Sequence, residues 1–381
     1  MLLKELVYLE YVVGRASICC WKCWMRLQQP IRQQSLRCSK ISKMEKTDLL
    51  TDSIEDIQKA SQIIKNGGVV GIPTETVYGL GADALNPEAV KKIFAAKGRP
   101  ADNPLIVHIY NIEQVKELAH DIPDLFYILA EKFWPGPLTM IVPKNDIVPV
   151  ETSGGLETVG IRMPLHPVMR KLIELSGPVA APSANRSGYP SPTKAEHVMN
   201  DMNGKIEAVV DGGECRYGVE STVICFDDEK TIRILRPGSI TREMFLQCTD
   251  NVIIDEAILS DLKAGRTAPS PGMKYKHYSP EADVVLVEGD YDSFCDYVSE
   301  HMDSRTYCLV YDTDDIQKLK CRYMTYGSND SEQAHNIFAK LRELDILHAG
   351  KVFVRPPEKN GVGLAVYNRL LRAAGFEVIK L

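Results

Sequence analysis

One segment in the last third of the chain cannot form regular structure, and it divides the sequence in two. Residues 262–282 (LKAGRTAPSPGMKYKHYSPEA) show no hydrophobic periodicity and contain Pro269, Pro271, Gly272 and Pro280. Proline lacks a backbone N–H and its ring fixes φ, so neither a helix nor a central strand runs through such a segment. We therefore expect a linker with a folded region on each side. The linker also carries a histidine and two tyrosines, which is unusually aromatic for a passive spacer.

The region before the linker alternates between helical and strand patterns. Residues 52–66 place apolar side chains on one helical face, with Asp52 or Ser53 as the N-cap and Gly67 as the stop signal. Near the end of this region we expect a hairpin that pairs residues 221–226 with residues 231–238. Mixed elements, densely punctuated by Gly and Pro, predict an α/β or α+β domain over 53–245. We expect further helices at 88–97, 122–134 and 166–177 and further strands at 69–73, 104–109, 138–143 and 178–185.

The region after the linker has a simpler order. Strand patterns near 283–288, 306–311, 351–357 and 376–381 alternate with helical patterns near 292–302, 332–347 and 363–375. Strands that alternate with helices predict a small parallel α/β domain.

The first 44 residues differ in character from the rest. Residues 11–44 carry seven basic side chains and no acidic one, the charge pattern of a mitochondrial presequence, although Glu5 and Glu10 precede them. An unstructured tail is the equally weighted alternative, and Met44 offers a second start. The ten cysteines fit neither a zinc-finger nor a disulfide framework, so we expect reduced thiols. No apolar run approaches the roughly 20 residues that a membrane span needs.

The net charge and the absence of several familiar motifs exclude some classes of function. The net charge of −6 argues against a dedicated nucleic-acid binder. The sequence contains no P-loop, dinucleotide fingerprint, nucleophile elbow or H-E-x-x-H zinc motif. Any ATP handled by this chain is therefore bound by another scheme.

Polar residues instead gather where expected strands and helices end. They occur in PTETVYGLGADA (73–84), KGRPADNPLIVH (97–108), APSANRSGYPSPT (181–193), and GVESTV with LRPG (218–223 and 235–238). Each alone also fits an ordinary turn, a helix C-terminus or a solvated arginine. Cations that converge on one pocket suit phosphoryl or nucleotidyl chemistry, but spacing cannot show convergence.

Taken in order, these motifs resemble one family. PTETVYGL, KGRP-x-x-x-PL-x-x-H, GIRMP, APSAN-x-SG, ESTV and LRPG resemble the YrdC family. PGM-x-YKHYSP (271–280) and GVGLAVYNRLLRAAG (361–375) are similar to its longer, two-domain threonylcarbamoyl-adenylate synthases. The resemblance covers about residues 50–381 and implies a twisted, open mixed sheet followed by a linker and a small Rossmann-like domain. It implies a catalytic domain over 51–245, a linker and active-site lid over 246–282, and a C-terminal domain over 283–381. Residues 1–50 are expected to form an N-terminal extension that is not a feature of the family.

The resemblance also implies a reaction and its ligands. L-Threonine, carbon dioxide or bicarbonate, and ATP with Mg²⁺ would give threonylcarbamoyl-AMP and pyrophosphate, and a separate tRNA threonylcarbamoyl transferase complex would use the product. The threonine site would comprise Thr76, His108, Arg162, Ala181 and Ser221. The ATP site would comprise Arg99, Asn103, Thr158, Ser183, Ser191, Arg236 and His277. Lys97, Arg99 and Asn185 would serve the phosphates and the intermediate, with a lid at 269–280.

Two other functions compete with this one. Carbamoyl transfer in hydrogenase maturation uses a related domain, but the acylphosphatase and zinc-finger segments of those proteins are absent here. An RNA-binding regulatory module without turnover would exploit the family's basic concave face, and weak contact with double-stranded RNA or tRNA fits either function. We expect a cytoplasmic protein, with a mitochondrial form if the N-terminal extension is a presequence.

Overall fold

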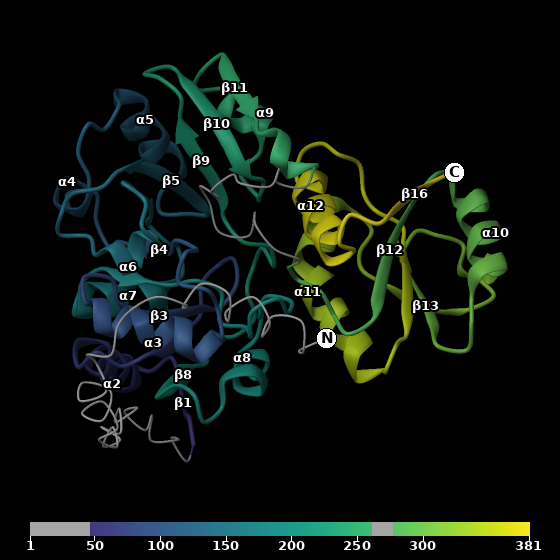
Figure 1. Cartoon of the computed structure of the whole chain (residues 1–381), viewed down its shortest axis with the longest axis horizontal. Helices are drawn as coiled ribbons and strands as arrows, with labels where there is room; N and C mark the ends of the chain where they lie inside the picture. Colours follow the sequence, from purple (N-terminus) through teal and green to yellow (C-terminus); the bar gives the residue numbers. More distant parts are fainter. Residues whose placement is uncertain (1–45, 261–276) are drawn as a thin grey trace, which may run out of the picture. The chain divides into compact units, whose positions relative to one another are not determined.

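The structure is a computed structural model that describes residues 46–260 and 277–381 of the chain. The N-terminal extension and most of the expected lid lie outside these residues. The described residues form two sheets, the first before and the second after the linker (Figure 1). Within the described ranges, no helix is long and apolar enough to cross a membrane.

The first sheet has eleven strands of mixed direction in the order β1-β8-β2-β3-β7-β4-β6-β5-β9-β10-β11. The expected hairpin is confirmed, since β9 pairs antiparallel with β10. The strands are β1 (Asp48–Leu50), β2 (Val70–Ile72), β3 (Gly79–Asp83), β4 (Ile106–His108), β5 (Leu138–Pro143), β6 (Thr158–Arg162), β7 (Val179–Ala180), β8 (Ala208–Val210), β9 (Thr222–Phe226), β10 (Thr231–Arg236) and β11 (Asn251–Ile254).

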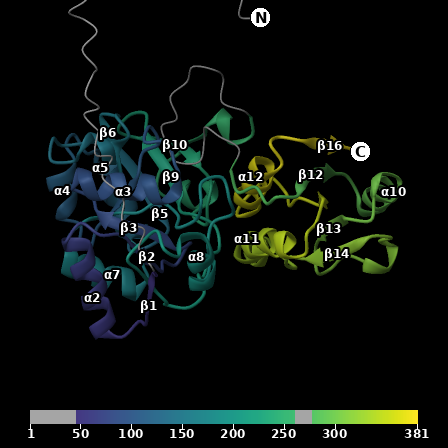
Figure 2. The ribbon, with the colours of Figure 1, turned by 60° about the horizontal axis from the view of Figure 1, so that its bottom comes forward.

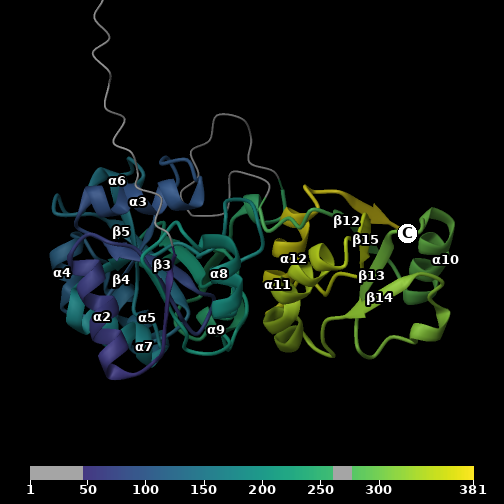
Figure 3. The same cartoon turned by 90° about the horizontal axis from the view of Figure 1, so that it is seen from below.

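Helices cover both faces of this sheet. Core side chains from α3, α5 and α8 pack on one face, and those from α2 and α7 pack on the other. Figure 3 shows α2 beside α7, consistent with their packing in one cluster. The helices are α2 (Ile54–Lys65), α3 (Pro87–Lys97), α4 (Gln114–Leu118), α5 (Asp124–Phe133), α6 (Val150–Ser153), α7 (Pro167–Ser176), α8 (Ala195–Met202) and α9 (Arg242–Phe245), with a 3₁₀ turn at Glu256–Ile258.

Local signals fix helix α3, which matters for the site. The Asn86 side chain accepts hydrogen bonds from two backbone N–H groups of the first turn, and Pro87 occupies the first helical position. Gly98 ends the helix in the left-handed conformation, with φ of 63°. The chain therefore turns sharply between Lys97 and Arg99, which places both cations at one helix end.

The first domain extends beyond both boundaries expected from the sequence. β1 pairs with β8 before residue 51, and β11 pairs with β10 after residue 245. Both are edge strands of only three or four residues, so the alternation of apolar and polar side chains in each is too short to predict a strand. The segment 246–254 thus belongs to the sheet and not to the linker.

The second sheet is entirely parallel, as the sequence predicts, in the order β14-β13-β15-β12-β16. Helix α10 packs on one face, and α11 and α12 pack on the other (Figure 2). The elements are β12 (Asp283–Glu288), α10 (Tyr291–His301), β13 (Thr306–Val310), β14 (Arg322–Thr325), α11 (Asp330–Ile346), β15 (Lys351–Val354), α12 (Gly363–Ala373) and β16 (Val378–Lys380), with a 3₁₀ turn at Ile316–Lys318. The six described cysteines are free thiols.

Candidate active site

A cavity lies where the polar ends of several strands of the first sheet meet the last residues of the linker. Its walls come from the segment after β2, the turn after α3, the ends of β4, β6, β7 and β10, and the residues before β9. Nine residues expected at the site line it, namely Thr76, Arg99, His108, Arg162, Ala181, Ser183, Ser221, Arg236 and His277. The structure therefore brings together side chains that the sequence leaves scattered.

Strand register explains one pair directly. β4 and β6 run parallel, and His108 is the partner of Arg162 at their carboxyl ends. Adjacent parallel strands that end together present their last side chains at the same edge of the sheet. An imidazole and a guanidinium therefore share one wall of the cavity.

Arg162 is held by protein groups on two sides. Its Nη2 lies 2.6 Å from Oε1 of Glu75, and its Nε donates to the carbonyl of Gly136 at 3.3 Å. The second oxygen of Glu75 accepts from the Leu165 backbone N–H at 3.1 Å. A buried charge needs such pairing, so Glu75 fixes the guanidinium in the wall.

Hydroxyl groups lie around the same region. The Thr74 and Thr76 hydroxyls are 2.8 Å apart, and Thr74 also donates to the carbonyl of Val77 at 2.6 Å. Ser221 shares a hydrogen bond of 2.8 Å with the Thr139 hydroxyl. All four are buried, so these hydroxyls are oriented rather than solvated.

The two histidines of the cavity are neutral at pH 7. Burial first, and then the nearby Arg162, lowers the pKa of His108 to about 3. Burial and the charge of Arg99 lower the pKa of His277 to about 3. Each ring can therefore accept or donate a hydrogen bond without adding charge.

Two further arginines bring positive charge to the cavity. Arg99 donates from Nη2 to the carbonyls of Asn103 and Pro104, each at 3.3 Å. Arg236 donates to the carbonyl and hydroxyl of Ser221 at 3.0 and 3.1 Å. Burial lowers the pKa of Arg99 to about 10, which leaves it protonated at pH 7. Fixed cations in a buried site suit a substrate on which negative charge accumulates.

Lys97 and Asn185 do not line the cavity; they bond each other beneath one of its loops. The Lys97 ammonium donates to the backbone carbonyls of Ser183 and Asn185 and, at 3.3 Å, to the side-chain oxygen of Asn185. Burial and the charge of Arg99 hold the Lys97 pKa well below its usual value. The polar atoms of both side chains thus bond the loop, and their expected contact with the phosphates stays a prediction.

Three more expected ATP ligands lie behind the wall. Ser191 donates to Glu220 at 2.5 Å, and Glu220 itself lines the cavity. Thr158 faces a separate small depression beside Pro104. The side-chain oxygen of Asn103 is buried without a hydrogen-bond partner.

Unpaired polar atoms mark the same place. Buried side-chain atoms without a partner include Arg99 Nε, Asn103 Oδ1, His108 Nδ1 and His277 Nδ1. Leaving such an atom unpaired costs about 1–3 kcal/mol. Three of these atoms belong to Arg99, His108 and His277, which line the cavity, so a polar ligand bound there would supply their missing hydrogen bonds.

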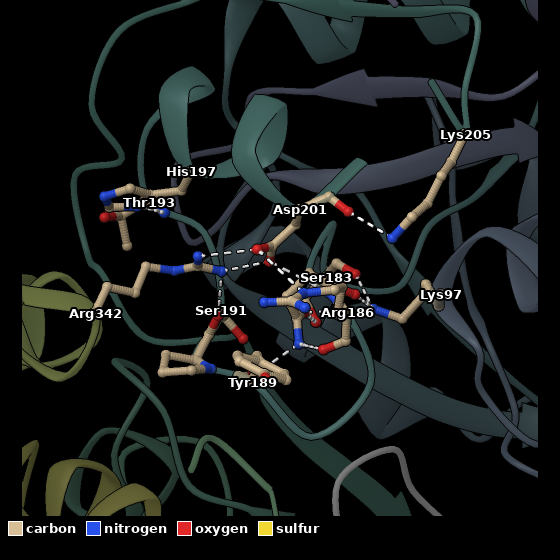
Figure 4. Close-up of polar contacts among 12 residues, drawn as sticks. Lys97, Ser183, Arg186, Tyr189, Ser191, Thr193, His197, Asp201, Lys205 and Arg342 are labelled. Carbon is tan, nitrogen blue, oxygen red and sulfur yellow. Dashed lines mark hydrogen bonds and ion pairs between the residues drawn. The ribbon is translucent and has the colours of Figure 1, made fainter. Parts of the chain in front are cut away.

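A network of polar contacts supports the loop that follows β7 (Figure 4). Asp201 of α8 accepts from the Arg186 backbone N–H at 3.2 Å and from Nη2 of Arg342 at 2.7 Å. Arg342, from α11, also donates to the carbonyl of Pro190 at 2.6 Å. The second domain therefore holds the loop that leads to Ser191.

Sequence reasoning missed several residues that matter here. Glu220 and Tyr278 line the cavity, and Arg369 of α12 bonds Glu220. Glu220 belongs to ESTV and Arg369 to the NRLLRAAG segment, so both stood inside quoted motifs without an expected role. Neither motif alone indicates that the two side chains form a pair.

Gly81 has a packing role in the sheet. A Cβ there would lie 2.4 Å from the Ile72 side chain in the neighbouring strand β2. Gly79, in contrast, lines the cavity.

The described residues include no cluster of metal ligands and only the last part of the expected lid. Within 46–260 and 277–381, no group of three or more His, Cys, Asp or Glu side chains is placed to hold a metal ion. Residues 269–276 of the expected lid lie outside the described part of the chain, whereas its His277 and the adjoining Tyr278 line the cavity.

Family models match both domains. Residues 62–238 match the Sua5/YciO/YrdC model, described as telomere recombination. Residues 240–375 match the model described as threonylcarbamoyl-AMP synthase, C-terminal domain.

Three relatives match over nearly their whole length. A Pyrococcus abyssi protein named threonylcarbamoyl-AMP synthase is 45% identical over 335 residues, covering 85% of this chain and 96% of that protein. A Bacillus subtilis protein of the same name is 43% identical over 343 residues, covering 88% and 97%. A crystal structure of P. abyssi Sua5 complexed with L-threonine superposes with a TM-score of 0.80 at 43% identity, covering 88% of this chain and 99% of that one.

Proposed function

This chain belongs to the family of two-domain threonylcarbamoyl-AMP synthases, and from that premise we propose that its buried cavity joins L-threonine, carbon dioxide and ATP. The products are threonylcarbamoyl-AMP and pyrophosphate, so the chain is a nucleotidyltransferase of tRNA modification. One observation carries the assignment of the cavity: the five residues expected to bind threonine all line it. The match to both domains favours this synthase over a hydrogenase-maturation enzyme.

Threonine fits the wall formed by β4, β6 and the segment after β2. Its carboxylate pairs with the Arg162 guanidinium, which Glu75 already holds in place. Its hydroxyl forms a hydrogen bond with the hydroxyl of Thr76 or Ser221. The neutral His108 forms a hydrogen bond with the bound threonine without altering the local charge. The Ala181 backbone completes this part of the site.

ATP fits the side of the cavity that carries Arg99, Ser183, Arg236 and His277. The threonine nitrogen bonds to the carbon of carbon dioxide and loses a proton, which gives N-carboxythreonine. An oxygen of the new N-carboxylate then bonds to the α-phosphorus of ATP. The bond between that phosphorus and the oxygen that bridges the α- and β-phosphates breaks, and its electron pair leaves with pyrophosphate. The nucleophile is ionised at pH 7, and catalysis rests on positioning and on charge stabilisation by the arginines.

Mg²⁺ is proposed to enter with ATP. Glu220 in the cavity wall and Glu75 behind Arg162 are each paired with an arginine, so phosphate oxygens and water would supply most of the metal's ligands. Bound in this way, the ion would offset negative charge on the triphosphate.

The labile product requires a protected route out of the cavity. We propose that His277 and Tyr278, which line the cavity, help to shield the adenylate from water. A separate transferase complex then moves the threonylcarbamoyl group to tRNA. A cytoplasmic protein, with a mitochondrial form directed by the basic N-terminal extension, fits the proposal.

The deciding experiment measures pyrophosphate release with ATP and bicarbonate, comparing L-threonine, L-serine and no amino acid. Release that depends on threonine supports the proposed function, whereas ATP turnover indifferent to threonine, or none, points to an RNA-binding module. Arg99→Ala and Arg236→Ala should abolish release with the fold intact. Arg233→Ala is the matched control, because Arg233 also lies in β10 but pairs with Asp227 away from the cavity.

A further inference from the structure

Helix α12 of the second domain presents three buried polar side chains to backbone groups of the first domain. Asn368 donates to the carbonyl of Ile258 at 2.7 Å, and Arg372 donates to the carbonyl of Ala257 at 2.8 Å. Arg369 donates to the carbonyl of Pro237 at 2.7 Å and is 0% exposed. Arginine is almost never fully buried unless it is paired, so these contacts are specific.

Arg369 also reaches a carboxylate that lines the cavity. Its Nε lies 2.9 Å from Oε2 of Glu220, and its guanidinium carbon lies 5.8 Å from the centre of the Tyr278 ring. The other oxygen of Glu220 accepts from the Ser191 hydroxyl at 2.5 Å. A residue of the second domain thereby touches two residues in the wall of the proposed active site.

The negative charge of Glu220 would oppose ATP binding if no cation neutralised it. Burial alone would raise its pKa, but Arg369, Arg236 and the Ser191 hydroxyl offset this and hold the pKa below its usual value. Glu220 is therefore ionised beside a cavity proposed to receive a triphosphate. If Arg369 did not neutralise it, its charge would repel the phosphates and attract the guanidinium of Arg236.

We propose that Arg369 is a positioning residue for the ATP half of the site: it holds and neutralises Glu220 so that Arg236 stays available to the nucleotide. The contact with Pro237 strengthens this role, because that carbonyl belongs to the residue next to Arg236. The inference rests on the proposed function. It assigns the NRLLRAAG segment of α12 a part in substrate binding as well as in domain packing.

The test compares Arg369→Met with Arg372→Met in the full chain. Arg372 is a matched control, because it is buried on the same helix and bonds the first-domain carbonyl of Ala257, which does not line the cavity, whereas Arg369 bonds Glu220, which does. Affinities for a non-hydrolysable ATP analogue and for L-threonine are measured by calorimetry, together with the melting temperature. Arg369→Met should weaken ATP-analogue binding about tenfold or more, with threonine binding within about twofold of wild type. Arg372→Met should lower the melting temperature but leave both affinities near wild type.

Two further variants separate positioning from folding. Arg369→Lys keeps the charge but not the paired donors, and should lose less affinity than Arg369→Met. Adding Glu220→Gln to Arg369→Met removes the unpaired carboxylate while keeping an acceptor for Ser191, and should restore analogue binding to within about threefold of wild type. If Arg369→Met does not fold, these two variants carry the test.

Several outcomes would overturn the inference. They are equal ATP affinity in the Arg369→Met and Arg372→Met variants, equal weakening of ATP and threonine, or no rescue by Glu220→Gln. The wild-type pyrophosphate assay keeps the two proposals apart. A wild type without threonine-dependent release contradicts the proposed function, whereas an active wild type with an unresponsive Arg369 contradicts this inference alone.

Discussion

The guanidinium of Arg162 lies 2.6 Å from the carboxylate of Glu75, and both side chains are only 4% exposed. Glu75 also accepts from the Leu165 backbone, so the carboxylate joins β6, the chain after β6 and the segment after β2. The arginine proposed to bind threonine is therefore oriented before substrate arrives. Pre-organisation of this kind lowers the entropic cost of binding.

Breaking this pair should affect both stability and threonine binding. Glu75→Ala leaves Arg162 buried and unpaired, which should lower the free energy of unfolding by about 3–5 kcal/mol and raise the KM for threonine more than that for ATP. Urea unfolding and steady-state kinetics measure the two effects. Glu174→Ala is the control, because its ion pair with Lys171 is largely exposed and should contribute at most about 1 kcal/mol. A Glu75→Ala loss no larger than the control would contradict the role of this pair.

The buried histidines should make stability depend on pH. The pKa of His108 is about 3 in the folded state, below the usual 6.5, so the unfolded chain binds its proton first as pH falls. Stability is therefore complete above about pH 6.5 and decreases as pH falls toward 3.

At pH 5 this single group should cost about 2 kcal/mol relative to pH 7. His108→Gln should remove that part of the decrease in urea unfolding measured at both pH values. The exposed His120 provides the matched substitution, His120→Gln, which should keep the wild-type decrease. An unchanged pH slope in His108→Gln would show that His108 titrates normally.

Lys97 should act through the loop after β7. Lys97→Met leaves the carbonyls of Ser183 and Asn185 without their buried donor, which should lower the free energy of unfolding by about 2 kcal/mol or more and reduce the rate of pyrophosphate release. Lys91→Met is the control on the same helix, because Lys91 is exposed and pairs with Glu88. If Lys97→Met lost activity with no loss of stability, direct contact with the phosphates would be the better explanation.

Elements with local signals could be predicted, whereas those defined by distant partners could not. Helix α2 begins at the Ser53 cap and α3 ends at Gly98, and both signals are visible in the sequence. Strand β1 is three residues long and pairs Asp48 with Ala208, so nothing near it indicates its partner.

The same distinction holds at the candidate site. Motif resemblance supplied nine of the residues that line the cavity, but spacing could not show that Lys97 bonds Asn185 beneath the loop. Nor could it show that Glu220 pairs with Arg369, because 149 positions separate them in the chain. Charge pairs between domains are set by tertiary packing, and a single sequence leaves no local trace of them.

Arg342 provides a second connection between the domains, and it can be tested separately from Arg369. Its guanidinium donates hydrogen bonds to Asp201 and to the carbonyl of Pro190, and these two contacts hold the loop that leads to Ser191 (Figure 4). Arg342→Met leaves the buried Asp201 without this partner, so we expect a loss of about 2–3 kcal/mol in unfolding free energy and a higher KM for ATP.

Lys340→Met is the control for this prediction. Lys340 lies on the same helix, and its partly exposed pair with Glu343 should contribute less than about 0.5 kcal/mol. Chemical unfolding and the ATP dependence of pyrophosphate release are measured on both variants. A KM for ATP that stays at the wild-type value in Arg342→Met, despite the lost stability, would show that the loop keeps its shape without the second domain's arginine. In that case the influence of the second domain on the nucleotide would pass through α12 alone.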